Sequence, residues 1–435
     1  MRKTMALVLM VCLCTVTLFA GGQTGNTSSG GGWASTDRYT FWTFVDLHQI
    51  FYQEMLDIWN RNNPTKRINI DFSNLPYAEM HNNVTMAVQT GRGMPDIVDI
   101  EISQFPNFMR GNIAFYPLNR FIEPYRATTV ASRIAIYAKD GQEYGVPTHV
   151  GATVMFYNVE LLEAAGVDYR AIVTWDDFTA AGRQYRQRTG KPITTVDTAG
   201  HDWLSVSMAA HREDWTNAAG RANIEIASVR NMLNLQQGWV RDGIAVTSPG
   251  GHVDMETGFA NILAGGLAAF PKAMWFMSRF VNYMPEMAGK WAIAPLPVFQ
   301  RGQPRSVGVG GTGTVISKTA KNPELLAEFL CWAKLSRLGN EKIWENLGFD
   351  TCNTEIWSDT RITQDRSNKY IAYFRTNPFD TLNAIKNEIG MIRVQQINPT
   401  IHEQINTNVL VGVLQDMGNV DALLREAQRL INLEQ

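Results

Sequence analysis

Hydrophobic positions in the first third of the chain switch between the two-residue period of a strand and the longer period of a helix. Aromatic and β-branched residues fill the first strand-like run, and Asn62-Asn63-Pro64 ends the first helical one. The predicted order is strand 39–44, helix 49–60, strand 67–72, helix 77–89 and strand 96–100. This alternation predicts a parallel α/β sheet.

The rest of the chain carries weaker signals of the same mixed kind. The pattern predicts a β-prone run at 144–157, followed by a helix that begins at Leu161 and ends at Gly166. A further helix is predicted to start after Thr174 as its N-cap. Towards the C-terminus the pattern predicts a helix from Asn322-Pro323 through Trp332 and an amphipathic helix at 421–432. The Gly-rich run 308–313 matches GxGxxG, but β-prone residues follow it where a dinucleotide site needs a helix. We therefore expect a flexible crossing strand there, with no nucleotide and no other cofactor.

Length and charge restrict the class of protein. With 435 residues and 45% hydrophobic positions, the chain is long enough for two domains, each with its own core. The formal net charge of −2 lacks the basic excess of a nucleic-acid-binding protein. We expect a monomer that binds no nucleic acid.

The first residues predict export. Arg2 and Lys3 precede fifteen mostly apolar residues, and small residues at 20–22 offer a cleavage site, as in a secretory signal peptide over 1–20. Residues 21–38 are rich in Gly, Ser and Thr and predict a flexible leader. Cys12 and Cys14 follow bulky residues, so no lipid anchor is expected. The predicted location is periplasmic or extracellular.

Two cysteines remain after such a cleavage, Cys331 and Cys352. They are either buried free thiols or, in an oxidising compartment, a disulfide. The mature chain has no CxxC and no Cys/His cluster, so we expect no metal site.

Several segments together resemble extracellular solute-binding protein family 1, the sugar-binding group that includes maltose-binding proteins. They are FWTFVDLHQIFYQEMLDIWNRNNPTKRINIDF, GRGMPDIVDIEISQF, YGVPTHVGATVMFYNVELLEAAGVD with TWDDF, and KWAIAPLP with VGVGGTGTVISKTAKNPELLAEFL. Each motif alone is weak, but their order and spacing cover nearly the whole mature chain.

The resemblance implies an α/β, two-lobed periplasmic-binding-protein fold with a hinge and a ligand cleft between the lobes. Lobe one would comprise 39–148 plus 313–346, and lobe two 149–312 plus 347–435. It further implies a binding protein, not an enzyme, that captures a sugar and delivers it to a membrane ABC permease. Lobe closure over the ligand would be the signal of loading.

Candidate ligand-binding residues follow from two arguments. Ligands of parallel sheets bind beyond the carboxyl ends of the strands, here near 42–48 and 99–104. Sugars require aromatic platforms together with carboxylates or amides for their hydroxyls. By position and by resemblance the candidates are Trp42, Phe44, Asp46, His48, Glu101, Gln104, His149, Trp203, Trp275 and Gly311.

Each candidate also has a structural alternative. Any of the twelve tryptophans can be a core residue, and Asp46 can cap a helix. Maltose-binding protein has a carboxylate at the position of Gly151, so its own ligand does not transfer to this chain. The segment 400–408, where relatives add an aromatic, has none.

Other functions stay open at this point. No HExxH, GxSxG or Walker loop occurs, but paired carboxylates such as Asp176-Asp177 or Asp99 with Glu101 leave a secreted glycoside-acting enzyme as an alternative. Binding of glycerol phosphate or another polar solute, or a sensory role, would use the same fold.

Overall fold

The computed structural model describes residues 37–434. The predicted signal peptide and nearly all of the predicted leader lie outside the described residues. Two sheets organise the described chain, and each is the centre of one lobe. Within residues 37–434 no helix is long and apolar enough to cross a membrane.

The first lobe is built on a five-stranded mixed sheet. In spatial order its strands are β2 (Asn69–Asn74), β1 (Arg38–Thr43), β3 (Ile97–Glu101), β13 (Thr312–Ile316) and β6 (Gly145–Pro147). The predicted parallel pairing holds for β2, β1 and β3, whereas β13 runs antiparallel to both of its neighbours. The sheet is therefore not purely parallel, because a strand from much later in the chain enters between β3 and β6.

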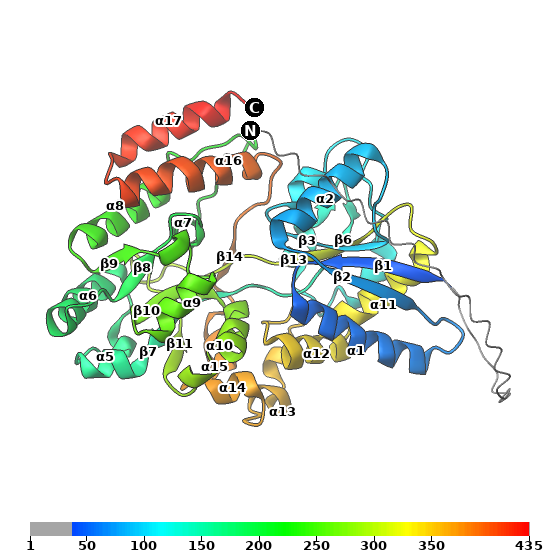
Figure 1. Cartoon of the computed structure of the whole chain (residues 1–435), viewed down its shortest axis with the longest axis horizontal. Helices are drawn as coiled ribbons and strands as arrows, with labels where there is room; N and C mark the ends of the chain where they lie inside the picture. Colours follow the sequence, from blue (N-terminus) through cyan, green and yellow to red (C-terminus); the bar gives the residue numbers. More distant parts are fainter. Residues whose placement is uncertain (1–36, 435) are drawn as a thin grey trace, which may run out of the picture. The chain divides into compact units, whose positions relative to one another are not determined.

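Helices cover this sheet. They are α1 (Asp46–Asn62), α2 (Tyr77–Thr90), α3 (Asn119–Ile122), α4 (Ala131–Ala135), α11 (Pro323–Leu335) and α12 (Arg337–Leu347), and a small hairpin joins β4 (Ala138–Lys139) to β5 (Gln142–Glu143). In Figure 1 the yellow α11 lies beside the blue α1, although the two are far apart in sequence. Pro323 at the first turn of α11 agrees with the predicted helix start.

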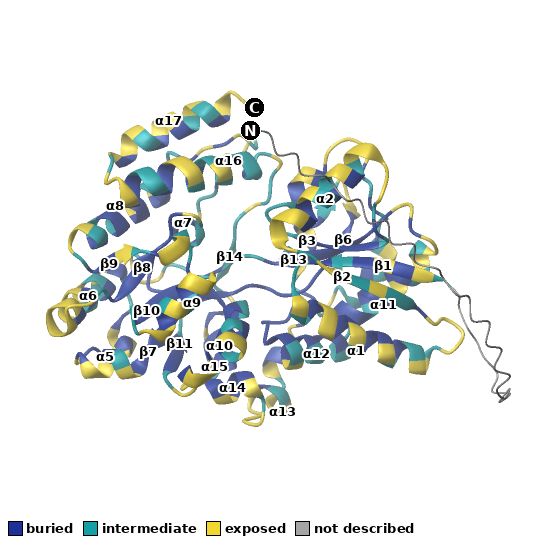
Figure 2. Ribbon diagram, in the orientation of Figure 1, coloured by how far each residue is buried: buried dark blue, intermediate teal, exposed yellow. Residues whose placement is uncertain are grey.

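The second lobe is built on a three-stranded antiparallel sheet. β7 (Thr153–Asn158) lies between β10 (Ala269–Ala273) and β11 (Trp291–Ala294). Helices and loops cover both of its faces, so nearly every residue of the three strands is buried (Figure 2). Two parallel pairs accompany it, β8 (Thr194–Val196) with β9 (Ala245–Thr247) and β12 (Ser306–Gly308) with β14 (Ile389–Met391).

Eleven helices complete the described part of this lobe. They are α5 (Val159–Ala164), α6 (Trp175–Thr189), α7 (Asp202–His211), α8 (Ala227–Arg241), α9 (Glu256–Leu263), α10 (Met277–Tyr283), α13 (Thr360–Thr363), α14 (Lys369–Tyr373), α15 (Pro378–Ile385), α16 (Asn398–Gln404) and α17 (Val420–Asn432). Thr174 caps α6 as predicted, in a reciprocal capping box with Asp177. Two π-helical segments, Ile405–Val409 and Val411–Gln415, follow α16, and α17 then packs back on α8 (Figure 1).

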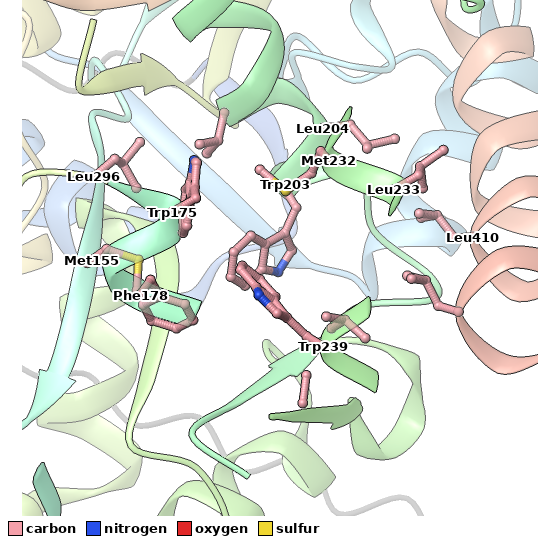
Figure 3. Close-up of a cluster of buried hydrophobic side chains, with 14 of the residues drawn as sticks. Met155, Trp175, Phe178, Trp203, Leu204, Met232, Leu233, Trp239, Leu296 and Leu410 are labelled. Atoms are coloured by element: carbon pink, nitrogen blue, oxygen red, sulfur yellow. The ribbon is translucent and has the colours of Figure 1, made fainter. Parts of the chain in front are cut away.

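The core of the second lobe is rich in tryptophan. Trp175, Trp203 and Trp239 contact one another with ring centroids 5.6–5.9 Å apart (Figure 3). Trp203 is only 4% exposed. Its indole is therefore part of the core of the lobe.

Two crossing segments, residues 148–152 and 308–312, lead between the second lobe and the strands β6 and β13 of the first-lobe sheet. They are hydrogen-bonded to each other through the Val309 amide and the Gly151 carbonyl, 2.9 Å apart. Gly151 has φ +73°, and a Cβ there would lie 2.5 Å from the Val309 carbonyl oxygen, so this contact requires glycine. The predicted β-prone run 144–157 is thus two strands of different sheets, divided at Gly151.

Cys331 and Cys352 are both free and buried. Burial raises the pKa of the Cys352 thiol to about 12. The thiols are therefore protonated at neutral pH and behave as small apolar side chains.

Candidate functional site

A cleft of ≈ 980 Å³ opens where the crossing segments meet the two lobes. Its walls come from the ends of β1 and β3 in the first lobe, from β8–α7, β10 and α10 in the second, and from the crossing segments and α16. These segments are distant in sequence.

The first-lobe wall consists of aromatic rings and one carboxylate. Phe44 packs edge-on against Tyr77 at 5.3 Å, and Tyr77 is 40% exposed. Glu101 accepts hydrogen bonds from the Tyr77 hydroxyl (3.2 Å) and from the Ser103 amide (2.8 Å) and hydroxyl. Burial raises the pKa of Glu101 above its ordinary value, although the Ser103 hydroxyl and amide oppose the shift. A carboxylate held in this way can accept further hydrogen bonds from ligand hydroxyls.

A buried polar network supports this wall from below. His48 Nδ1 lies 2.9 Å from Asp99 Oδ2, and Asp99 also accepts from the hydroxyls of Thr43 and Thr314. Burial opposes the ionisation of Asp99, but the nearby charges of His48 and Lys334 lower its pKa overall. The network therefore fixes the first turn of α1, from which His48 lines the cleft.

Trp275 is the centre of the second-lobe wall. It is half-buried, and its indole Nε1 donates to the Val309 carbonyl at 3.1 Å. The Lys272 ammonium and the Arg279 guanidinium lie 5.6 and 5.5 Å from its ring, within cation–π distance. Trp275 packs against apolar residues of both lobes.

The two cations beside Trp275 each have an acidic partner. Lys272 donates to Asp202 at 2.5 Å, and Arg279 donates to both carboxylate oxygens of Asp254 at 2.9 and 3.3 Å. Burial alone would raise the pKa of Asp202, but Lys272 lowers it to about 2. Each cation of this wall is therefore paired with a carboxylate within residues 37–434, and the wall offers polar edges to a ligand.

A third wall consists of ring and amide side chains from the two ends of α7 and from α16 and the segment after it. His402 of α16 stacks on His201 with centroids 4.0 Å apart, and Trp215 meets both rings edge-on. His201 Nδ1 lies 3.2 Å from the amide oxygen of Asn406. Burial lowers the pKa of both histidines, so they are neutral at pH 7. In segment 400–408 the sequence has no Phe, Tyr or Trp at the place where relatives have an aromatic contact. The structure shows that His402 and Asn406 of this segment line the cleft instead.

The crossing segments form the floor of the cleft. His149 is buried against Phe349 at 4.7 Å, and neither of its ring nitrogens has a hydrogen-bond partner among residues 37–434. Burial lowers the pKa of His149 well below its ordinary value. A neutral imidazole without partners leaves one donor and one acceptor for a ligand or water.

The structure brings most of the predicted site residues to this cleft. Its lining includes Phe44, His48, Glu101, Gln104, His149, Trp275 and Gly311. Trp42, Asp46 and Trp203 do not line it. Trp203 lies in the core of the second lobe, and Asp46 instead accepts a hydrogen bond from the Asn74 amide.

Trp42 lies on β1 opposite Ser73 of β2 and packs beside the core of the first lobe. Sequence reasoning also missed Tyr77, Lys272 and Arg279, which line the cleft. Tyr77 begins α2 and Arg279 lies on α10, neither of which is the end of a strand. Within residues 37–434 no group of His, Cys, Asp or Glu is arranged to hold a metal ion.

Two α/β lobes around a polar and aromatic cleft define a two-lobed solute-binding protein. The family model of the bacterial extracellular solute-binding proteins matches residues 42–336. The chain belongs to that family, and it is a binding protein, not an enzyme.

Two curated relatives are similar over nearly the whole chain. The arabinooligosaccharide-binding protein of Bacillus subtilis is 37% identical over 417 residues, 95% of each chain. The arabinooligosaccharide-binding protein of Halalkalibacterium halodurans is 36% identical over 399 residues, 91% of this chain and 89% of the relative.

A solved structure shows the same fold at low identity. The ABC transporter associated binding protein from B. animalis subsp. lactis, in complex with beta-1,6-galactobiose, superposes with a TM-score of 0.75 at 17% identity, over 91% of this chain and 96% of the other. The two-lobed architecture implied by the sequence is confirmed.

Proposed function

We propose that the chain captures a neutral arabino-oligosaccharide in the cleft and delivers it to the membrane permease of an ABC importer. The neutralised charge of the second-lobe wall carries this proposal. Lys272 and Arg279 are already paired with Asp202 and Asp254, so neither cation is free to pair with an anionic ligand. Neutral hydroxyls can hydrogen-bond such pairs without breaking them.

The size of the cleft supports a ligand of more than one sugar unit. Its ≈ 980 Å³ lies near the upper end of the roughly 300–1,000 Å³ that is usual for small-molecule sites. The two relatives of 36% and 37% identity are named for arabino-oligosaccharides. A single pentose would leave much of the lining without contact.

The proposed contacts divide between the lobes. Trp275, Phe44 and Tyr77 would present ring faces or edges to the apolar side of the sugar, and Glu101, Gln104 and His149 would bind its hydroxyls. Because the ligand would touch both lobes, its binding favours the closed arrangement. The lobe boundaries we propose are 39–148 plus 313–346 and 149–312 plus 347–435.

We further propose that the chain works as a monomer outside the cytoplasmic membrane, after cleavage of a signal peptide over 1–20 and without a lipid anchor. The apolar run that follows Arg2 and Lys3 supports export.

Isothermal titration of the purified chain tests the ligand class. Arabinose, arabinobiose and arabinotriose would be compared with maltotriose, galactobiose and glycerol 3-phosphate. We expect arabinotriose to bind at least tenfold more tightly than arabinose, with no comparable binding of the other compounds. Binding of glycerol 3-phosphate alone, or of maltotriose in preference to arabinotriose, would overturn the proposal.

A further inference from the structure

A second cavity, of ≈ 450 Å³, lies beside the crossing segments. It shares Gly308 with the ligand cleft, and all its other lining residues are different. Polar side chains come to it from three directions: Ser132 and Arg133 from α4, Asn383 from α15, and Lys386 and Asn387 from the turn before β14. Among the described residues that line it there is no Asp or Glu.

Arg133 is a buried cation at the wall of this cavity. It is 1% exposed, and it ties the two crossing segments together by donating from Nε to the His149 carbonyl (3.1 Å) and from Nη2 to the Gly310 carbonyl (2.7 Å). Its Nη1 has no acceptor among residues 37–434 and lies against Gly308, where a Cβ would be 3.1 Å away.

No described acid pairs with this guanidinium. Arg133 makes no ion pair in the described chain. An arginine guanidinium in a protein normally keeps its charge. The nearby Asp350 uses one carboxylate oxygen to accept from the Ala152 amide at 2.6 Å. Burial raises the pKa of Asp350 to about 7, so its compensation of Arg133 is incomplete at neutral pH. A buried charge without an anion is costly.

The open side of the cavity adds a second positive charge. Lys386 is exposed and has no ion-pair partner within residues 37–434. Asn383 donates to the Trp357 carbonyl at 2.8 Å, which fixes its amide at the wall. The lining thus offers the cations of Arg133 and Lys386, the amides of Asn383 and Asn387, and the hydroxyl of Ser132. Such hydrogen-bond donors suit the oxygens of a carboxylate or a phosphate.

We propose that this cavity is an anion site, in which Arg133 and Lys386 bind the carboxylate or phosphate group of a small molecule. The site is distinct from the ligand cleft. Since Arg133 also holds both crossing segments, an anion bound there is linked to the hinge between the lobes.

The test is a titration of the full purified chain with inorganic phosphate and, separately, with succinate, at ionic strength held constant with chloride. Four proteins are compared: wild type, Lys386→Gln, Arg133→Lys and Lys318→Gln. Lys318 is an exposed lysine that lines neither cavity, and its variant controls for loss of net charge.

We expect saturable binding of at least one anion to wild type and to Lys318→Gln. Lys386→Gln should weaken it about two- to fivefold, because that lysine is exposed to solvent. Arg133→Lys should weaken anion binding more than tenfold. If this variant does not fold, the double variant Ser132→Ala with Lys386→Gln takes its place and should bind the anion more weakly than Lys386→Gln alone. Whichever anion binds identifies the recognised group.

Two results would overturn the proposal. One is the absence of saturable binding of both anions, which would leave Arg133 as a structural tie hydrated by water. The other is equal affinity in wild type and Lys386→Gln, which would place the anion elsewhere on the chain.

Discussion

Replacement of Trp275 by alanine is the most direct test of the proposed cleft. The change removes an indole that lies within cation–π distance of Lys272 and Arg279 and donates to the Val309 carbonyl at 3.1 Å. A buried aromatic platform at a binding site typically contributes about 1–3 kcal/mol. The dissociation constant of the proposed oligosaccharide should therefore rise roughly 5- to 150-fold.

A second substitution separates the ring face from the hydrogen bond. Trp275→Phe keeps an aromatic platform but loses the donor to Val309, which contributes about 0.5–1.5 kcal/mol. We expect its affinity to fall between those of wild type and Trp275→Ala. Trp332→Ala is the matched control, because Trp332 is also half-buried but packs against Trp59 on α1, outside the cleft.

Isothermal titration with arabinotriose measures the affinities, and thermal unfolding without ligand confirms that each variant is folded. Wild-type affinity in a folded Trp275→Ala protein would refute the assignment of Trp275 as a platform. An equal loss in Trp332→Ala would show that the effect is a general loss of stability.

Three further predictions concern stability. Gly151→Ala should cost about 2 kcal/mol or more of the free energy of unfolding, since it combines φ +73° with a Cβ 2.5 Å from the Val309 carbonyl oxygen; urea denaturation measures it. Trp203→Ala should cost about 3–5 kcal/mol in the same assay, because its indole lies in the core. Asp350 has its folded pKa raised to about 7 from an ordinary 3.8, so its contribution to stability is present at low pH and is lost as the pH rises through 7. Between pH 5 and 8 this loss amounts to about 2–3 kcal/mol, and Asp350→Asn should remove that part of the pH dependence.

Each of these predictions has a control. Gly91→Ala has a similar φ of +66° with no atom within 4 Å of the added Cβ, so it measures the backbone cost alone. Equal losses for Gly91→Ala and Gly151→Ala would contradict the steric argument. Trp203→Ala should be more costly than Trp332→Ala, and a pH profile of Asp350→Asn parallel to that of wild type would exclude Asp350 as the titrating group.

Local patterns in the sequence were sufficient for most elements of the fold. The strand-like runs at 39–44 and 96–100 and the helical run at 77–89 predict β1, β3 and α2 to within two residues. Thr174 with Asp177 marks the start of α6, because the capping box is a contact between near neighbours in sequence. The direction of β13 could not be predicted locally, since it depends on where the chain returns to the first sheet.

The site was only partly predictable, for a related reason. Phe44, Glu101 and Gln104 follow strand ends, and the carboxyl edge of a parallel sheet is a general site for ligands. The sequence around Trp203 and Trp275 does not show that the first indole lies in the core and the second at the cleft. Tertiary packing decides between these two positions. Tyr77, Arg279 and His402 begin or lie on helices whose orientation toward the cleft is set by contacts distant in sequence.

The position of β13 also determines how the chain folds. Asp99 of β3 is hydrogen-bonded to Thr314 of β13 at a sequence separation of 215 residues, and in the described sheet β6 is joined only through β13. The first lobe therefore cannot complete its sheet until residues 149–312 of the second lobe have been synthesised. Contacts of such long sequence separation slow folding. Because of this topology, the nascent chain has no completed first lobe for most of its synthesis. A chain without a completed domain can still pass through a translocation channel.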